Sequence, residues 1–219
     1  IDVAKACREQ GIRSVAVTAG YVCPEPRAEF YRHMDAANVD LKAFSDDFYR
    51  RLCGGHLQAV LDTLEYIHRE TSVWLEITTL LIPGENDSPK ELEAMTAWIA
   101  DRLGPDVPLH FSAFHPDWKM RDTPNTPPET LRMARAIALE NGLRHVYVGN
   151  VHDKTASSTY CHQCGLILIG RDWYTLSDWN LTTEGGCRQC GTPLAGVFEA
   201  LPGDWGAKRR PVRLQSGPS

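Results

Sequence analysis

The sequence lacks long hydrophobic runs, a secretory signal and an excess of positive charge. No apolar stretch approaches the length of about 20 residues that a membrane-spanning helix requires, so we expect no membrane segment. The formal net charge is −5, whereas a broad nucleic-acid surface needs clustered Lys and Arg. The one basic run lies in a tail that we expect to be disordered over 201–219, and it contains Lys208, Arg209, Arg210 and Arg213. These absences favour a soluble globular protein whose partner is not nucleic acid.

A disulfide framework is also missing, because the seven cysteines are odd in number and no signal for secretion precedes them. Four form two close pairs, which leaves Cys7 in a predicted helix and Cys23 and Cys53 in predicted loops. Thiolates bound to metal in a reducing compartment account for this usage, so we expect a cytoplasmic protein. The chain begins at Ile1, not Met, which suggests a fragment or a processed product.

Residues 1–152 alternate between helical and strand patterns. Apolar residues at helical spacing predict helices over 3–10, 26–34, 57–70, 89–103 and 128–140. Runs rich in β-branched and aromatic residues predict strands over 14–18, 38–43, 73–82, 109–114 and 144–148. This alternation is typical of a parallel sheet with right-handed crossovers. We therefore expect an α/β fold, a partial (β/α) barrel made of C-terminal strand–helix units.

The strongest local signal is a set of four cysteines, Cys161, Cys164, Cys187 and Cys190, that read C-x2-C-x22-C-x2-C. Two thiolates three residues apart can hold one tetrahedral ion, and the glycine after each pair lets the backbone fold under the sulfurs. We expect a closed, structural site for zinc, with a rubredoxin-like iron site as the alternative. Short β-like segments around the pairs predict a small zinc-ribbon-like β module over 159–200, after a boundary near 151–158.

Candidate chemistry lies where the predicted strands end, because ligands of parallel α/β sheets bind at the carboxyl ends of strands. Asp40 and Lys42 share one face of a strand, Glu76 interrupts an apolar strand, and His115 follows another. Burying such charges is costly unless they are paired or used. A solvent-facing edge strand or an ordinary loop histidine explains each residue alone. Their convergence at one predicted barrel mouth favours a binding or catalytic site.

Four segments in this order, 38–42, 48–52, 80–87 and 111–116, resemble the radical S-adenosylmethionine enzymes. Their motifs are Asn-Val-Asp-Leu-Lys, Phe-Tyr-Arg-Arg-Leu, Leu-Leu-Ile-Pro-Gly-Glu-Asn-Asp and Phe-Ser-Ala-Phe-His-Pro. The resemblance covers roughly residues 1–200 and points to the pyruvate formate-lyase activating enzyme-like group. Within this group it points to the AmmeMemoRadiSam system branch, whose members carry a C-terminal ribbon with paired cysteines.

The resemblance implies a mechanism and a set of site residues. A 4Fe–4S cluster would bind S-adenosylmethionine and cleave it reductively to a 5′-deoxyadenosyl radical, which abstracts hydrogen from a protein or small-molecule substrate. By position, Asp40, Lys42 and His115 match the family's residues near the cofactor. Thr18 and Gly20 match its turn after the preceding strand.

The sequence also departs from the family. Glu76 stands where the activating enzymes use an arginine, and Val17 and Ala19 replace the aspartate and asparagine of their cation site. The C-x3-C-x2-C cluster motif and a Gly-Gly-Glu segment are absent from the 219 residues. We therefore expect the C-terminal part of a radical enzyme that is not competent alone.

Two other functions fit the residues less fully. The first is a zinc-ribbon binding module on a non-catalytic α/β scaffold. The second is an unrelated α/β enzyme that uses Asp40, Lys42 and His115 without a cluster.

Overall fold

The computed structural model describes residues 1–203. The basic run at 208–213 and all but three residues of the expected disordered tail lie outside the described residues. The chain divides into two compact units, Ile1–Ser157 and Ser158–Ser219. Within residues 1–203, no helix has both the length and the hydrophobicity needed to cross a bilayer.

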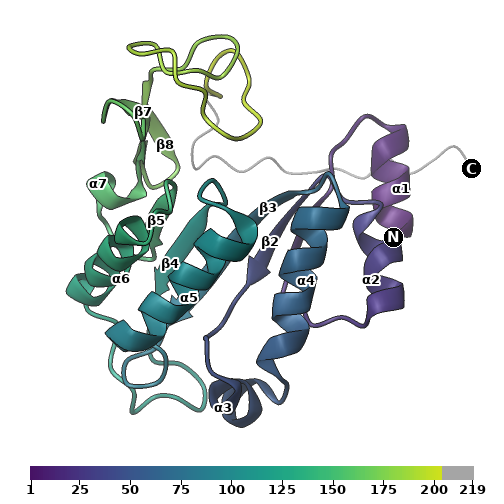
Figure 1. Ribbon diagram of the computed structural model, residues 1–219, viewed down its shortest axis with the longest axis vertical. Coiled ribbons are helices and arrows are strands. Elements are labelled where there is room, and N and C mark those ends of the chain that lie inside the picture. Colours follow the sequence, from purple (N-terminus) through teal and green to yellow (C-terminus); the bar gives the residue numbers. More distant parts are fainter. Residues whose placement is uncertain (204–219) are drawn as a thin grey trace, which may run out of the picture. The chain divides into compact units, whose positions relative to one another are not determined.

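The first unit is a parallel sheet whose strands alternate with helices (Figure 1). In chain order its elements are α1 (Asp2–Glu9), β1 (Val15–Thr18), α2 (Pro24–Tyr31), β2 (Ala36–Asp40), α3 (Asp46–Phe48), a π-helical turn (Tyr49–Cys53), α4 (Leu57–Glu70), β3 (Trp74–Leu81), α5 (Pro89–Leu103), β4 (Leu109–Ala113), α6 (Pro128–Glu140), β5 (Val146–Gly149) and α7 (Lys154–Ser157). The sheet order is β1-β2-β3-β4-β5, and every neighbouring pair is parallel. This arrangement confirms the expected partial α/β fold.

Two predicted elements had wrong bounds. β2 ends two residues before Lys42, so this lysine lies beyond the strand and not within it. The second helix begins directly after Cys23 and ends at Tyr31, because Cys23 is extended and two prolines occupy the first turn.

The predicted loop around Cys53 contains helical structure instead. Ser45 caps α3 by accepting a hydrogen bond from the Phe48 backbone N–H at 3.4 Å. The π-helical turn follows without a break and is capped at its C-terminus by Gly54, whose φ of 68° is left-handed. Polar capping and a terminal glycine are local signals that the hydrophobic pattern of a short segment does not reveal.

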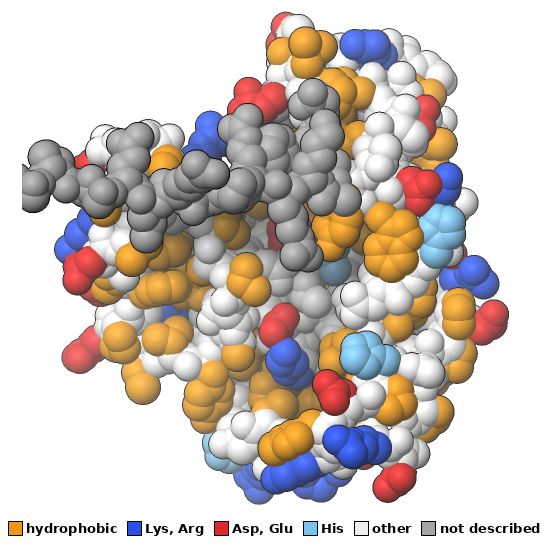
Figure 2. Space-filling model, turned by 180° about the vertical axis from the view of Figure 1, so that it is seen from behind, with side chains coloured by type: hydrophobic (Ala, Val, Ile, Leu, Met, Phe, Trp, Pro, Cys, Tyr) orange, Lys and Arg blue, Asp and Glu red, His pale blue; other side chains and the backbone are white. Residues whose placement is uncertain are grey.

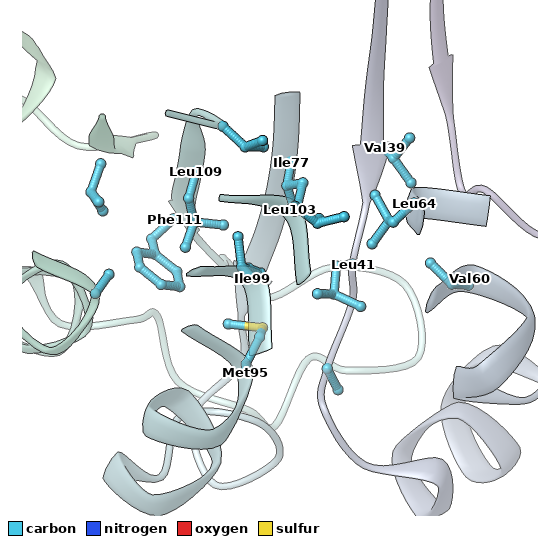
Figure 3. Packing of buried hydrophobic residues seen from close by; sticks show 14 of the residues in the cluster. Val39, Leu41, Val60, Leu64, Ile77, Met95, Ile99, Leu103, Leu109 and Phe111 are labelled. Carbon is cyan, nitrogen blue, oxygen red and sulfur yellow. The ribbon is translucent and has the colours of Figure 1, made fainter. Parts of the chain in front are cut away.

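Strand residues alternate between a face covered by helices and a second face over which residues 1–157 place no helix, called the uncovered face below. Figure 1 shows α4 and α5 in front of the sheet. The core lies between these layers and includes the residues labelled in Figure 3: Val39, Leu41, Val60, Leu64, Ile77, Met95, Ile99, Leu103, Leu109 and Phe111. Intervening strand residues such as Asp40, Glu76 and His110 are half-buried and point to the other face. Burial of one face therefore fixes the register that orients the polar side chains on the other.

The second unit is a small antiparallel β module. β6 (Thr159–Tyr160), β7 (Ile167–Asp172) and β8 (Thr175–Trp179) form its sheet. Its core is small and contains two of the cysteines, and its buried members are Cys161, Leu168, Ile169, Leu181, Cys187 and Leu194. The module fits the zinc-ribbon-like architecture expected from the cysteine spacing.

Candidate functional site

A row of polar and aromatic side chains crosses the uncovered sheet face. Asp40 is in register with Thr78, Thr78 with His110, and His110 with Tyr147. Four consecutive strands therefore contribute one residue each to the same level of the sheet. Figure 2 shows the molecule from behind, where acidic, basic and histidine side chains lie among hydrophobic ones. The candidate site residues are described below by their position relative to this row.

Asp40 and Lys42 form an ion pair at the carboxyl end of β2. The Lys42 Nζ lies 2.6 Å from the Asp40 Oδ2, and the side chains are 36% and 28% exposed. A pair this accessible contributes little to stability. Its two charges remain available to a ligand at the sheet edge, where parallel sheets bind their ligands.

The backbone of Lys42 is held from two sides by buried polar side chains. Its N–H donates to the Tyr49 hydroxyl at 3.0 Å, and its carbonyl accepts from the Asn86 Nδ2 at 2.6 Å. Asn86 also donates to the Leu80 carbonyl at 2.9 Å and accepts from the Ile82 N–H at 2.7 Å. Asn86 is 2% exposed, so its amide joins the ends of β2 and β3 away from water. The Pro-Gly-Glu-Asn-Asp motif thus fixes the chain beside Lys42.

Burial also raises the pKa of two groups that support the loop after β2. Tyr49 is nearly fully buried in the π-helical turn, and this burial raises the pKa of its phenol. Burial likewise raises the pKa of the Glu91 carboxyl, which accepts a hydrogen bond from the Phe44 N–H at 2.7 Å. These groups support the loop after β2, and the ionic pair faces outward.

Thr18 and Gly20 form a tight turn at the end of β1. The Thr18 Oγ1 accepts a hydrogen bond from the Gly20 N–H at 3.1 Å. Gly20 has a φ of +66°, and a Cβ there would lie 2.7 Å from the Val39 Cγ1. Glycine is therefore required by both conformation and packing. The turn keeps the end of β1 close to β2.

His115 is exposed and lies two residues beyond β4. The loop that carries it is tied down by Thr126, whose hydroxyl accepts from the Phe114 N–H at 2.9 Å and donates to the Leu81 carbonyl at 2.5 Å. Thr18, Gly20, Asp40, Lys42 and His115 thus all lie within two residues of a strand's carboxyl end, at one edge of the sheet.

The sequence analysis singled out Glu76 on the uncovered face but missed its partner, His110. The His110 Nε2 lies 2.7 Å from the Glu76 Oε2, and the Trp74 indole N–H donates to the Glu76 Oε1 at 3.0 Å. The His110 ring stacks on Tyr147, with ring centroids 5.1 Å apart. The strand alternation would have placed His110 on the same face as Glu76. Sequence alone did not show that these two strands are adjacent and in this register.

The second unit contains the four-cysteine cluster. The four Sγ atoms of Cys161, Cys164, Cys187 and Cys190 lie within 4.8 Å of one another, and the 161–190 and 164–187 pairs are 3.6 Å apart. A tetrahedral ion with zinc–sulfur bonds of about 2.3 Å requires sulfurs about 3.8 Å apart. The arrangement therefore fits one tetrahedral metal ion.

The two cysteine pairs have the same backbone geometry. Gly165 donates its N–H to the Cys161 carbonyl, and Gly191 donates its N–H to the Cys187 carbonyl, both at 2.9 Å. Both glycines are left-handed, with φ of 75° and 76°. Side-chain and backbone hydrogen bonds with Thr192 lower the pKa of the Cys190 thiol, which favours the thiolate that a metal needs. Within residues 1–203, Cys7, Cys23 and Cys53 belong to no such cluster.

Comparisons with known proteins give sequence relatives but no matching family model. The chain is 40% identical over 194 residues to the uncharacterized protein MJ0808 of Methanocaldococcus jannaschii. The match covers 88% of this chain and 57% of that protein. It is 27% identical over 133 residues to the pyruvate formate-lyase-activating enzyme of Clostridium pasteurianum. That match covers 56% of this chain and 55% of the enzyme. The chain thus spans little more than half the length of these curated relatives.

Solved structures show the same fold. A domain of the pyruvate-formate lyase-activating enzyme from Bacteroides vulgatus superposes with a TM-score of 0.60 at 19% identity, over 68% of this chain and 88% of that chain. A radical SAM methyltransferase from Sphaerobacter thermophilus gives 0.51 at 16% identity, over 64% of this chain and 42% of that chain. This chain is therefore a sequence relative of a pyruvate formate-lyase-activating enzyme and shares its fold with a domain of another.

Proposed function

We propose that this chain supplies the C-terminal part of a radical S-adenosylmethionine enzyme of the AmmeMemoRadiSam branch, acting on a protein or small-molecule substrate. The observation that carries the proposal is the Asp40–Lys42 pair at the end of β2 in a chain similar to an activating enzyme. The shared fold and the polar row on the uncovered face support it. When bound, a 4Fe–4S cluster would supply the electron that cleaves the sulfonium.

Residues 1–219 contain no C-x3-C-x2-C segment, so we assign no residue of this chain to the cluster. Cys7 lies in α1, Cys23 precedes α2, and Cys53 ends the π-helical turn, which does not make a cluster site. On this proposal the isolated chain does not generate the radical. The chain's own contribution is to bind and orient the cofactor and the substrate.

Each strand-end residue has a chemical role in this proposal. The Lys42 ammonium would attract the cofactor's carboxylate, and the Asp40 carboxylate would accept hydrogen bonds from its amine or hydroxyl groups. His115, exposed in the loop after β4, would lie against the cofactor. The turn of Thr18 and Gly20 would hold the end of β1 beside it.

The four-cysteine cluster would hold a structural zinc ion, with iron as the alternative. Four thiolates complete the tetrahedron, so no position remains for a substrate or an activated water. The ion would stabilise the second unit, whose own core is too small to do so alone.

The experiment that tests the proposed function has a genetic and a biochemical part. The DNA upstream of the Ile1 codon should continue in frame into a C-x3-C-x2-C segment and a Gly-Gly-Glu strand. The protein encoded by that full reading frame should bind S-adenosylmethionine in calorimetry, and Lys42→Ala should weaken binding about tenfold or more. Lys90→Ala, which removes an exposed charge from α5, is the matched control. An intact reading frame without three clustered cysteines, or equal affinities in both variants, would contradict the proposal.

A second candidate function is a binding module built on the ribbon. Trp173 and Tyr174 at the turn between β7 and β8 are 60% and 72% exposed, and Trp173 has a left-handed φ of 54°. Exposed aromatic residues of this kind favour a protein partner. Loss of partner binding on Trp173→Ala, with cofactor binding unchanged, would support this candidate.

A further inference from the structure

Glu76 and His110 form a carboxylate–imidazole pair that none of the preceding roles uses. They lie on adjacent strands, β3 and β4, and their facing atoms, Oε2 and Nε2, are 2.7 Å apart. Their side chains are 36% and 32% exposed. The pair is therefore accessible from the uncovered face and is not a buried structural ion pair.

The neighbours of the pair fix its geometry and its tautomer. The Trp74 indole N–H donates to the other carboxylate oxygen, Oε1, at 3.0 Å. An ionised carboxylate only accepts hydrogen bonds, so the proton between Glu76 and His110 belongs to the Nε2 of His110. The Nδ1 is then the nitrogen that accepts a proton. Stacking on Tyr147 holds the ring plane. A base oriented by a carboxylate is the arrangement that general-base catalysis requires.

The position of the pair relates it to the proposed cofactor site. His110 shares its row with Asp40, and Thr78 of β3 lies between them. Two strand spacings separate Asp40 from His110, or about 10 Å. Among residues 1–203, the titratable groups near His110 include Glu76 from β3, Tyr147 from β5 and, across the row, Asp40 with Lys42. A small molecule on this face could reach both the Asp40 end and the His110 end of the row.

We propose that Glu76 and His110 are an acid–base dyad for the substrate, which carries a hydroxyl or ammonium group. The proton leaves the substrate oxygen or nitrogen for the His110 Nδ1, and the electron pair of that bond stays on the substrate atom. The imidazolium keeps its Nε2–H on Glu76, which remains ionised. His110 is the catalytic residue, and Glu76 and Trp74 position it. That the proton donor is the enzyme's substrate rests on the proposed function. The acid–base chemistry of Glu76 and His110 does not rest on it.

The chemistry is tested on the chain as it exists with diethyl pyrocarbonate, which acylates accessible, unprotonated imidazole nitrogens. Peptide mass spectrometry gives the rate at each histidine, and ¹⁵N NMR of the labelled histidines gives the His110 tautomer. We expect the Nε2–H tautomer and a reactive Nδ1. We expect Glu76→Gln to slow acylation of His110 about threefold or more, because the neutral amide no longer stabilises the positive charge that develops on the ring. Trp74→Phe should slow it less, since the carboxylate remains.

His68, exposed on α4, is the matched control, and its rate should be the same in all variants. The proposal is overturned by an Nδ1–H tautomer, by an unreactive His110 beside a reactive His68, or by equal His110 rates in the wild type and in the Glu76→Gln variant. A separate arm compares S-adenosylmethionine binding by the full-reading-frame protein and by its Lys42→Ala variant. If Lys42→Ala does not weaken binding in that arm, the proposed function is contradicted, whereas the result for Glu76 and His110 is unaffected.

Discussion

Replacing Asn86 with alanine should destabilise the first unit far more than an ordinary loop substitution. The side chain is 2% exposed and makes three hydrogen bonds to backbone groups of Lys42, Leu80 and Ile82, at 2.6, 2.9 and 2.7 Å. The substitution removes all three bonds at a site that is closed to bulk solvent in the native fold. The expected loss can be worked out group by group.

The buried Ile82 N–H loses its acceptor, which costs about 2 kcal/mol. The carbonyls of Lys42 and Leu80 belong to half-buried residues, so each lost bond costs about 1 kcal/mol. The sum is about 4 kcal/mol in the free energy of unfolding. For a unit of this size it lowers the melting temperature by about 8–16 °C.

Urea unfolding followed by far-ultraviolet circular dichroism measures this loss, because the helices of the described residues all lie in the first unit. Asp87→Ala is the matched control in the same loop: its carboxylate accepts one exposed bond, from the Gly84 N–H at 2.9 Å. We expect that variant to lose about 1 kcal/mol. A loss below about 1 kcal/mol for Asn86→Ala, or a loss equal to that of Asp87→Ala, would refute the reasoning.

Three further predictions concern a glycine, a carboxylate and the metal cluster. Gly20→Ala should lower the free energy of unfolding in urea by about 3 kcal/mol, because the new Cβ meets Val39 at 2.7 Å and φ is +66°. Gly11→Ala, with a φ of +69° and open space around the new Cβ, should lower it by only about 1 kcal/mol. Similar losses in the two variants would disprove the clash with Val39. The Leu57 N–H bond to Asp46 lowers the pKa of that carboxyl from 3.8, so its stabilisation is present above the unfolded pKa and is lost as pH falls through the folded pKa. Asp46→Asn should therefore flatten the acid side of a stability–pH curve between about pH 5 and 2, and an unchanged slope would contradict this. Elemental analysis should find about one zinc or iron ion per chain, bound by the four thiolates. Cys187→Ser should abolish metal binding and unfold the second unit, while the circular dichroism of the first unit persists. Metal retained in that variant would exclude the four-cysteine cluster as the metal site.

Long periodic elements could be predicted from the sequence because their signals are local. The helices at 57–70, 89–103 and 128–140 have the predicted bounds, and Ser88 accepts from the Glu91 N–H at 3.3 Å as its spacing suggested. The segment after β2 could not be predicted, because the π-helical turn depends on capping and on Tyr49 packing beneath Lys42. Strand ends were also less certain, because hydrogen bonding to neighbours sets where a strand stops.

The sequence by itself determined the alternation of strands and helices, the cysteine pairs that converge on one tetrahedral cluster, and the set of polar residues near the strand ends. These follow from periodicity and from spacings of a few residues, which a chain fixes before it folds. Only the tertiary structure decided that Glu76 meets His110, because their contact depends on the register between β3 and β4. It likewise decided that Asn86 closes on Lys42, 44 residues away along the chain. Contacts of this kind are selected by packing of the buried face, since that packing sets strand register and carries the polar side chains with it.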